Sequence, residues 1–375
     1  MYIPADMLLS MISPKMIKLG RPRNVLEIGK GGYGTAATER GAALVLVDAS
    51  GGLGEIAAAA GGKKFDLAIA GDLTAEPGKL FAALKDHLTD GGHVLVPVPD
   101  QAGVERAEGL LRGAGLDVMR VDESTRGFAV MARIAPKKGK LSLTVGMLSM
   151  NEEPSVDKMM DEIRKYAPDA QILVVDSSSD RTPDMARAKG ATVIRQLPPR
   201  GHGPAMEALM YAASRQSDAL IYLDCDGTYP AHMIPRLRAV LEDGADMVNA
   251  SRTHHYPKSM PVPNFLANRF FAATAYAMHG VPTTDVHSGM RAYRSSMVRA
   301  FDFSGEGDAL PIDTLVLPAR SNYDVVELPI EYLERLGVSK LAKVRGTLWT
   351  FIRLASCVGQ GERVHGANHY RHLEG

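Results

Sequence analysis

The sequence has little of what would place the protein outside a reducing compartment or inside a membrane. Its 375 residues include two cysteines, Cys225 and Cys357, so no disulfide framework is expected and the cytoplasm is the predicted compartment. No apolar run is long enough for a membrane-spanning helix, and the N-terminal residues lack the basic and apolar regions of a signal peptide. Lys+Arg and Asp+Glu both number 43, so the overall charge gives no reason to expect a nucleic-acid partner.

The composition is that of a globular protein with two domains. Hydrophobic residues make up 45% and charged residues 23% of the chain, and the length exceeds that of a typical single domain. Both halves alternate strand-like and helix-like runs, which predicts the α/β class with mostly parallel sheets. We expect two Rossmann-like α/β domains at residues 1–135 and 141–358, a linker between them, and a C-terminal tail at 359–375.

The predicted strands are short apolar runs rich in β-branched residues. In the first half they cover residues 24–29, 43–48, 65–70, 93–98, 117–121 and 127–134. In the second half they cover residues 141–147, 170–175, 191–195, 219–223 and 246–250. Helices are expected at 79–88, 104–111, 155–166, 183–189, 204–214 and 230–242, the last with Pro230 in its first turn.

Asp224 and Asp226 are the most informative pair of residues, because they end the apolar run at 219–223. Side chains alternate across a strand, so both carboxylates point the same way and Cys225 points elsewhere. Two carboxylates at the end of a buried strand form a hard-oxygen site suited to Mg²⁺ or Mn²⁺. Aspartates also end strands as simple turn formers, so the pair alone is compatible with either interpretation.

Polar residues follow the other predicted strands of the second half as well. Ligands of open α/β sheets bind at the carboxyl ends of the strands, so these residues together predict one site. They include Ser149, Asn151, Glu152, Asp176, Asp180, Gly203 and Arg252. Each has a structural alternative, since Asp176 to Asp180 could cap the next helix, and the glycines around His202 could form a tight turn.

These motifs, in this order, resemble glycosyltransferase family 2, which has the GT-A fold, and within it the dolichol-phosphate mannosyltransferase-like branch. The resemblance covers residues 141–356 and rests on segments 150–153, 174–180, 224–230, 284–291, 327–332 and 335–340. It departs from the family pattern at Cys225, where alanine is usual, and at His202, where lysine is common. Many relatives also carry transmembrane helices, which this sequence lacks.

The resemblance implies a nucleotide-sugar donor held with Mg²⁺ or Mn²⁺. Asp224, Asp226 and His287 would hold the metal, and Asp224 would also contact the ribose. Asp176 would accept from the nucleobase, with Glu152 beside it. The remaining donor-binding residues would be Asn151, Asp180, Gly203, Arg291, Ser339 and Lys340, with Arg335 as a catalytic cation on the leaving diphosphate.

The resemblance further implies inversion at the anomeric carbon in one displacement, with a polyprenyl phosphate or another anionic acceptor. Asp285 would be the base for a hydroxyl acceptor, whereas for a phosphate acceptor it would position acceptor or sugar. Arg252 and Arg291 would hold an acceptor phosphate or serve as structural ion-pair residues. The turn-rich segment 253–261 is expected to be a lid over the acceptor. Its two adjacent histidines could bind a second metal, but a solvated loop is the preferred interpretation.

Residues 344–358 predict an amphipathic helix with basic residues. It would lie on a membrane surface, placing the protein peripherally at the inner face of the membrane, or dock on its own domain or on a partner subunit of a homo-oligomer.

In the first half, Glu27 precedes a run of glycines from Gly29 to Gly34, and Asp48 ends the next strand. With the closing strand pair, residues 24–134 resemble the S-adenosylmethionine-dependent methyltransferase fold. The segment 49–64 is too short for the usual helix–strand unit, and no catalytic group follows Gly71-Asp72. We therefore expect a degenerate domain without S-adenosylmethionine. The alternatives are a bifunctional glycosyltransferase and methyltransferase, and a non-catalytic nucleotide-binding scaffold.

Overall fold

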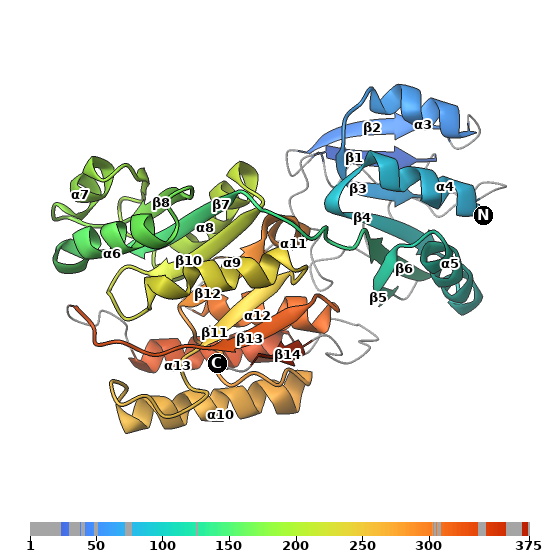
Figure 1. Ribbon diagram of the computed structural model, residues 1–375. Helices are drawn as coiled ribbons and strands as arrows, with labels where there is room; N and C mark the ends of the chain where they lie inside the picture. The colour runs from blue at the N-terminus through green and yellow to red at the C-terminus, as the bar shows by residue number, and fades with distance from the viewer. Residues whose placement is uncertain are drawn as a thin grey trace. The chain divides into compact units, whose positions relative to one another are not determined.

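The computed structural model describes residues 24–29, 38, 42–48, 52–71, 77–124, 127–301, 303, 305, 309–336, 343–357 and 370–373. The chain divides into two compact units (Figure 1). The first unit comprises Met1–Lys137, Arg299–Asp302 and Gly359–His365, and the second comprises Lys138–Val298, Phe303–Val358 and Gly366–Gly375.

The first unit contains a six-stranded sheet in the order β2-β1-β3-β4-β6-β5. Its strands are β1 (Asn24–Ile28), β2 (Ala43–Val47), β3 (Phe65–Ala70), β4 (Leu88–Val98), β5 (Asp117–Ser124) and β6 (Gly127–Arg133). β2, β1, β3 and β4 are parallel, and β6 runs antiparallel to both β4 and β5. The predicted strands are confirmed, with β4 and β5 longer than expected.

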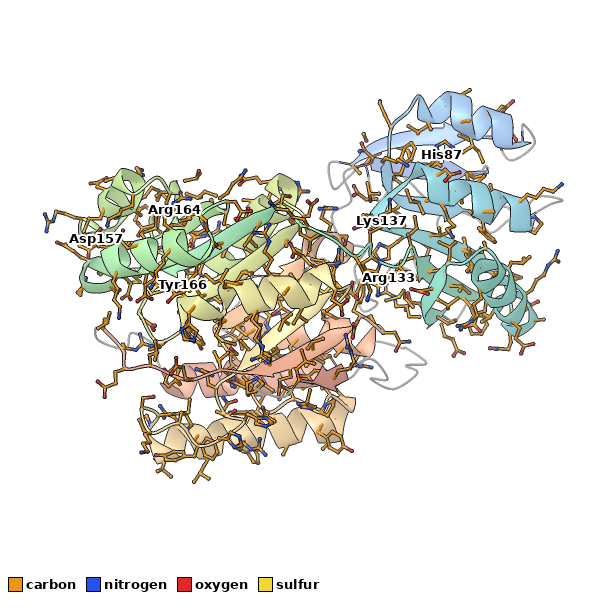
Figure 2. The ribbon with its side chains drawn as sticks, in the orientation of Figure 1. His87, Arg133, Lys137, Asp157, Arg164 and Tyr166 are labelled. Atoms are coloured by element: carbon orange, nitrogen blue, oxygen red, sulfur yellow. The ribbon has the colours of Figure 1, made fainter. Side chains whose placement is uncertain are left out.

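In the described part of this unit, the sheet is accompanied by the helices α3 (Gly52–Ala60), α4 (Pro77–Leu84) and α5 (Gln101–Gly113). Asp100 caps α5, because its side chain accepts a hydrogen bond from the backbone N–H of Gly103 at 2.7 Å. The helix predicted at 79–88 ends early: after Leu84 the chain makes a 3₁₀ turn, Lys85–His87, whose His87 is labelled in Figure 2. β4 then begins at Leu88.

The second unit contains an eight-stranded mixed sheet in the order β14-β13-β11-β12-β10-β7-β8-β9. Its strands are β7 (Leu143–Ser149), β8 (Gln171–Asp176), β9 (Thr192–Arg195), β10 (Ala219–Asp224), β11 (Met247–Ser251), β12 (Met290–Arg294), β13 (Val325–Pro329) and β14 (Tyr370–His372). β12 is antiparallel to β10 and β11, whereas the other pairs are parallel. Residues 370–372 thus form a strand of the sheet, although the sequence suggested a tail there.

The helices of the second unit are α6 (Glu153–Tyr166), α7 (Thr182–Ala188), α8 (His202–Gln216), α9 (Ile234–Glu242), α10 (Val262–His279), α12 (Leu310–Arg320), α13 (Lys343–Ser356) and most of α11 (Ser295–Ala300). The helix predicted from Pro230 instead starts as a 3₁₀ turn at Ala231–Met233, and the α-helix follows from Ile234. None of the helices within the described residues is long and apolar enough to cross a membrane.

α6 shows how the helices bury one face against the sheet. Val156, Met159 and Ile163 recur at helical spacing and are fully buried, and each such side chain contributes about 1.5–3 kcal/mol of burial free energy. Asp157 lies on the exposed face, as Figure 2 shows. Arg164, from the last turn, donates to the carbonyl of Ala170 at 2.9 Å and fixes the connection into β8.

Candidate active site at the carboxyl ends of the central strands

The sheet brings three predicted strand ends side by side. Asp224 at the end of β10 pairs in register with Leu148 of β7, and Ser149 of β7 pairs with Asp176 of β8. Because these strands are parallel, their carboxyl ends share one edge. The expectation that Asp176 and Asp224 lie on one rim is therefore confirmed by the strand register.

Asp176 is fully buried beneath this rim. Its carboxylate accepts hydrogen bonds from Ser149 Oγ at 2.7 Å and from both the backbone N–H and the hydroxyl of Ser178, at 3.0 and 2.5 Å. It also pairs with Arg195 Nη1 at 2.8 Å. The Arg195 side chain is 29% exposed, whereas Asp176 is buried. The arginine is therefore the accessible member of the pair, and Asp176 fixes its position.

The loops that follow β7 and β8 are joined through Asn151. Its backbone adopts φ 55°, a left-handed conformation that asparagine tolerates better than most residues. Its N–H donates to Ser178 Oγ at 2.7 Å, and its Oδ1 accepts from the N–H of Ser179 at 2.8 Å. These bonds fix the loop after β7 and position Glu152, which precedes α6.

Asp180 fixes the turn before α7, whereas the N-cap residue of that helix is Arg181, which makes no side-chain capping bond. Asp180 Oδ1 accepts from the backbone N–H and the hydroxyl of Thr182, at 3.0 and 2.5 Å. Thr182 Oγ1 in turn accepts from the N–H of Glu152 at 2.9 Å. Gly203 is buried in the first turn of α8, and the preceding Gly201 has φ 104°, so a glycine is favoured at this turn.

Asp224 lies at the end of a hydrogen-bonded chain. The Tyr222 hydroxyl donates to its Oδ1, and His202 Nε2 lies 3.2 Å from that hydroxyl. Burial, and after it the charge of Asp226, raises the pKa of Asp224 to about 7. A Cβ atom on Gly289 would lie 2.2 Å from Asp224 Oδ2, so only glycine allows the loop before β12 to approach this carboxylate.

Asp226 is 4% exposed and is held from two sides. Its Oδ1 accepts from the N–H and hydroxyl of Thr228, at 3.0 and 2.5 Å, and its Oδ2 lies 2.6 Å from Arg335 Nη1. Backbone bonds from Leu333 to Thr228 and from Leu336 to Asp226 bring the arginine there. The two predicted catalytic residues are 109 positions apart in the sequence, and their side chains are therefore joined directly.

The two carboxylates fit the divalent cation that the sequence implies, because Mg²⁺ and Mn²⁺ prefer oxygen ligands. The negative charge of Asp226 disfavours a second negative charge on Asp224 and contributes to its raised pKa. A bound cation would favour the ionised form of Asp224. Ser339 and Lys340, which the sequence assigns to the phosphates, lie outside the described residues.

The side chain of His287, which the sequence assigns to the metal, contacts α13 and α10. Its Nε2 lies 2.8 Å from Thr350 Oγ1, and its ring packs edge-on against Phe271 with centroids 5.4 Å apart. Burial lowers the pKa of His287 to about 4. Within the described part of the chain, a three-residue group with ligand atoms within 4.8 Å is formed by His254, Glu327 and His372, and not by Asp224, Asp226 and His287.

Asp285 forms a buried ion pair with Arg252. Arg252 Nε and Nη2 donate to Oδ2 and Oδ1 at 2.7 and 2.9 Å, a bidentate arrangement. The backbone N–H of Arg252, the amide of Asn268 and the N–H of His287 donate as well, at 3.0, 2.6 and 3.1 Å. Although burial alone would raise it, the Arg252 guanidinium holds the pKa of Asp285 well below its usual range.

Arg291, which the sequence assigns either to a ligand or to a structural role, lies in the protein core. Its side chain is fully buried. The guanidinium donates to Asn249 Oδ1 at 2.9 Å, to the Val286 carbonyl at 2.8 Å, and to Pro311 and Thr314. A guanidinium enclosed by protein acceptors ties β12 to β11 and α12 and leaves no surface for a phosphate.

A pocket of about 770 Å³ opens beside Arg252. Its walls come from the start of α9, the predicted lid segment and the chain after β13, and they include Arg236, Lys258, Tyr332 and Glu334. Arg252 lies 5.3 Å from the ring centroid of Tyr332 and 5.6 Å from that of Tyr229, a cation–π arrangement. Sequence reasoning missed Arg236, because a single arginine on a helix carries no motif.

Comparison with known proteins identifies a family and relatives for the second unit. Residues 144–301 match the family described as Glycosyl transferase family 2. A dolichyl-phosphate hexose transferase of Haloferax volcanii is 36% identical over 205 residues, 54% of this chain and 88% of the relative. An undecaprenyl-phosphate mannosyltransferase of Micrococcus luteus is 31% identical over 205 residues, 51% of this chain and 84% of the relative.

Among solved structures, the chain is similar to a glucosyl-3-phosphoglycerate synthase from Mycobacterium tuberculosis in complex with Mn²⁺, UDP-glucose and phosphoglyceric acid. The TM-score is 0.48 at 20% sequence identity, and the match covers 58% of this chain and 80% of the other. The family match spans the rim from β7 through Asp224 and Asp226 to the Asp285 and Gly289 segment.

Proposed function

The chain belongs to glycosyltransferase family 2, and we propose that it transfers a sugar from a UDP- or GDP-linked donor. The proposed acceptor is a polyprenyl phosphate or a related anionic molecule, and the proposed process is glycan or envelope polysaccharide synthesis. The observation that carries the proposal is the carboxylate pair Asp224 and Asp226 on the same rim as the cation-lined pocket at Arg252. The polyprenyl-phosphate transferases among the relatives support this choice of acceptor.

On the donor side, Asp226 and Asp224 would hold Mg²⁺ or Mn²⁺. When bound, the cation would supply positive charge to the leaving nucleoside diphosphate. Arg335 already lies against Asp226, so a donor that arrives with its cation would leave this guanidinium free to bind phosphate oxygens. Asn151, Asp180 and Asp176 would shape the nucleoside end by fixing the loops after β7 and β8.

On the acceptor side, the bidentate pair fixes Arg252 at the wall of the pocket. A phosphate acceptor is anionic at neutral pH and needs no proton removed before it attacks. Asp285 accepts five hydrogen bonds and has no exposed surface, which suits positioning better than proton abstraction. We therefore assign Asp285 to holding Arg252, with Arg236 and Lys258 as further cations for the acceptor phosphate.

Replacing Asp226 with asparagine tests the proposal. Transfer from UDP- or GDP-sugars to a polyprenyl phosphate in the presence of Mn²⁺ should be lost in Asp226→Asn and retained in the matched control Asp243→Asn, whose carboxylate is exposed and pairs with Lys138. Unchanged transfer in Asp226→Asn would refute the metal-dependent mechanism. Transfer by the unaltered protein would also eliminate the non-catalytic scaffold alternative.

For the first unit we propose a methyltransferase-like domain with a degenerate cofactor site. Support comes from Gly29, which follows β1 with φ 105°, and from the antiparallel strand β6 between β4 and β5. Among the described residues between β2 and β3, α3 is present without a further strand, which agrees with a shortened adenine-framing segment. Calorimetry with S-adenosylmethionine should give no binding heat, and micromolar binding would instead favour the bifunctional alternative.

A further inference from the structure

α10 has two apolar faces, and one of them is open. The face toward the unit carries Asn268, Phe271, Ala272, Ala275 and His279, which are buried. The opposite face carries side chains spaced by three or four residues, Val262, Leu266, Phe270, Ala273 and Ala277, all of which are exposed. A helix that is apolar all round is normally covered on every side.

The open face belongs to a larger apolar surface. Eight of the twelve large apolar side chains exposed in the described parts of the protein lie on α10, on the loop before it or on α13. They are Tyr256, Val262, Leu266, Phe270, Tyr276, Met278, Phe351 and Ile352. The rings of Phe270 and Phe351 lie 6.1 Å apart, which joins the two helices at this surface. In Figure 1, α10 lies at the outer edge of the second unit.

The segments that form this surface carry cations and no carboxylates. No Asp or Glu occurs between Asp246 and Asp285, and none occurs between Glu334 and Glu362. With 43 acidic residues in 375, stretches of this length would ordinarily contain several. The cations Lys258 and Arg269 are exposed on the loop and on α10. An apolar face whose own segments carry cations and no carboxylates is complementary to an anionic lipid surface.

We propose that the exposed face of α10, together with Phe351 and Ile352 of α13, docks the protein on an anionic bilayer. This rests on the proposed function, in which the acceptor is lipid-linked. The loop that leads into α10 also lines the acceptor pocket through Tyr256 and Lys258, so docking brings the pocket to the lipid phosphates. A second copy of the chain fits less well, because a two-fold contact would place the same cations against each other.

The test is co-sedimentation with vesicles of phosphatidylcholine containing phosphatidylglycerol, compared with phosphatidylcholine alone. The variant Val262→Gln/Leu266→Gln removes two side chains that are 52% and 60% exposed, so we expect it to fold, which its melting temperature checks. Binding to the anionic vesicles should fall by about tenfold or more, since it scales with buried apolar area. Leu197→Gln, at a side chain 59% exposed elsewhere in the same unit, should bind like the unaltered protein.

Arg269→Gln should reduce the preference for anionic over neutral vesicles. The proposal is overturned if the unaltered protein fails to bind the anionic vesicles, if the double variant binds them equally well, or if the double variant loses only self-association in sedimentation velocity. Transfer to a short, water-soluble polyprenyl phosphate without vesicles should be equal in the double variant and the unaltered protein. Absence of that transfer in both would refute the proposed function and leave the vesicle result standing.

Discussion

Arg335 Nη1 lies 2.6 Å from Asp226 Oδ2, so this arginine supplies the positive charge that the sequence assigns to a divalent cation. The two cations would compete for one carboxylate oxygen. Replacing Arg335 with alanine should therefore strengthen Mn²⁺ binding to the donor-free protein by about fivefold, the equivalent of about 1 kcal/mol for a partly exposed ion pair. Titration of Mn²⁺ followed by electron paramagnetic resonance measures this change.

The same substitution should lower turnover, because the guanidinium is also assigned to the leaving diphosphate. Opposite changes in Mn²⁺ affinity and in kcat distinguish this arrangement from a purely structural ion pair. The control is Arg238→Ala, since Arg238 is another arginine of the second unit and pairs with Asp169. This variant should leave the Mn²⁺ affinity unchanged. Weaker Mn²⁺ binding in Arg335→Ala would contradict the competition.

Gly289→Ala should impair the site through steric contact alone. The added Cβ would meet Asp224 Oδ2 at 2.2 Å and the Tyr229 hydroxyl at 2.9 Å, both of which are held in place by the surrounding structure. Displacing Asp224 should lower kcat/KM on the order of 100-fold, the cost of a misplacement of about 1 Å. Overpacking should also cost about 1–3 kcal/mol of stability.

The control for this steric effect is Gly109→Ala, since a Cβ on Gly109 of α5 meets no atom within 4 Å. It should leave both transfer and the melting temperature close to those of the unaltered protein. Full activity in Gly289→Ala would show that the loop before β12 moves away from Asp224 during the reaction.

Asp285→Asn should act through Arg252 rather than through lost proton abstraction. Removing the carboxylate breaks a buried ion pair, which costs about 3–5 kcal/mol of stability, and frees the guanidinium at the pocket wall. Asp285→Asn and Arg252→Ala should raise KM for the acceptor phosphate similarly, and the double variant should be no worse than either. A pH–rate profile with a basic limb that Asp285→Asn alone abolishes would instead identify Asp285 as the base.

The strand ends of the site could be predicted from sequence because local patterns specify them. An apolar run that ends in Asp224 and Asp226 predicts both a strand and the direction of its side chains, and the register of β7, β8 and β10 confirms the shared rim. The family resemblance predicts that Arg335 and Asp226 belong to the same site, but the sequence does not reveal that their side chains form an ion pair.

What the sequence did not reveal depends on long-range packing. Arg291 and His287 lie in one motif with Asp285, yet Arg291 turns into the core and His287 turns toward Thr350 of α13. A motif gives spacing along the chain but not the side of the strand or loop that a distant helix covers. α10 was missed for a related reason: its apolar residues on both faces give no amphipathic period to detect.

His287 should make the second unit sensitive to acid. Burial lowers its pKa from 6.5 to about 4, so the folded protein holds the imidazole neutral while the unfolded chain protonates it. The unfolded state therefore binds more protons between these two pH values, and stability falls as the pH decreases through that window. One pKa unit corresponds to about 1.4 kcal/mol, so the loss attributable to His287 amounts to a few kcal/mol at most. Denaturant unfolding at pH 7 and at pH 4.5 measures this loss.

His287→Gln, which keeps a hydrogen-bonding group toward Thr350, should be less stable than the unaltered protein at pH 7 and lose less stability on acidification. His255→Gln, at an exposed histidine of the lid segment, should follow the unaltered protein at both pH values, and an equal acid loss in His287→Gln would assign the effect to another group.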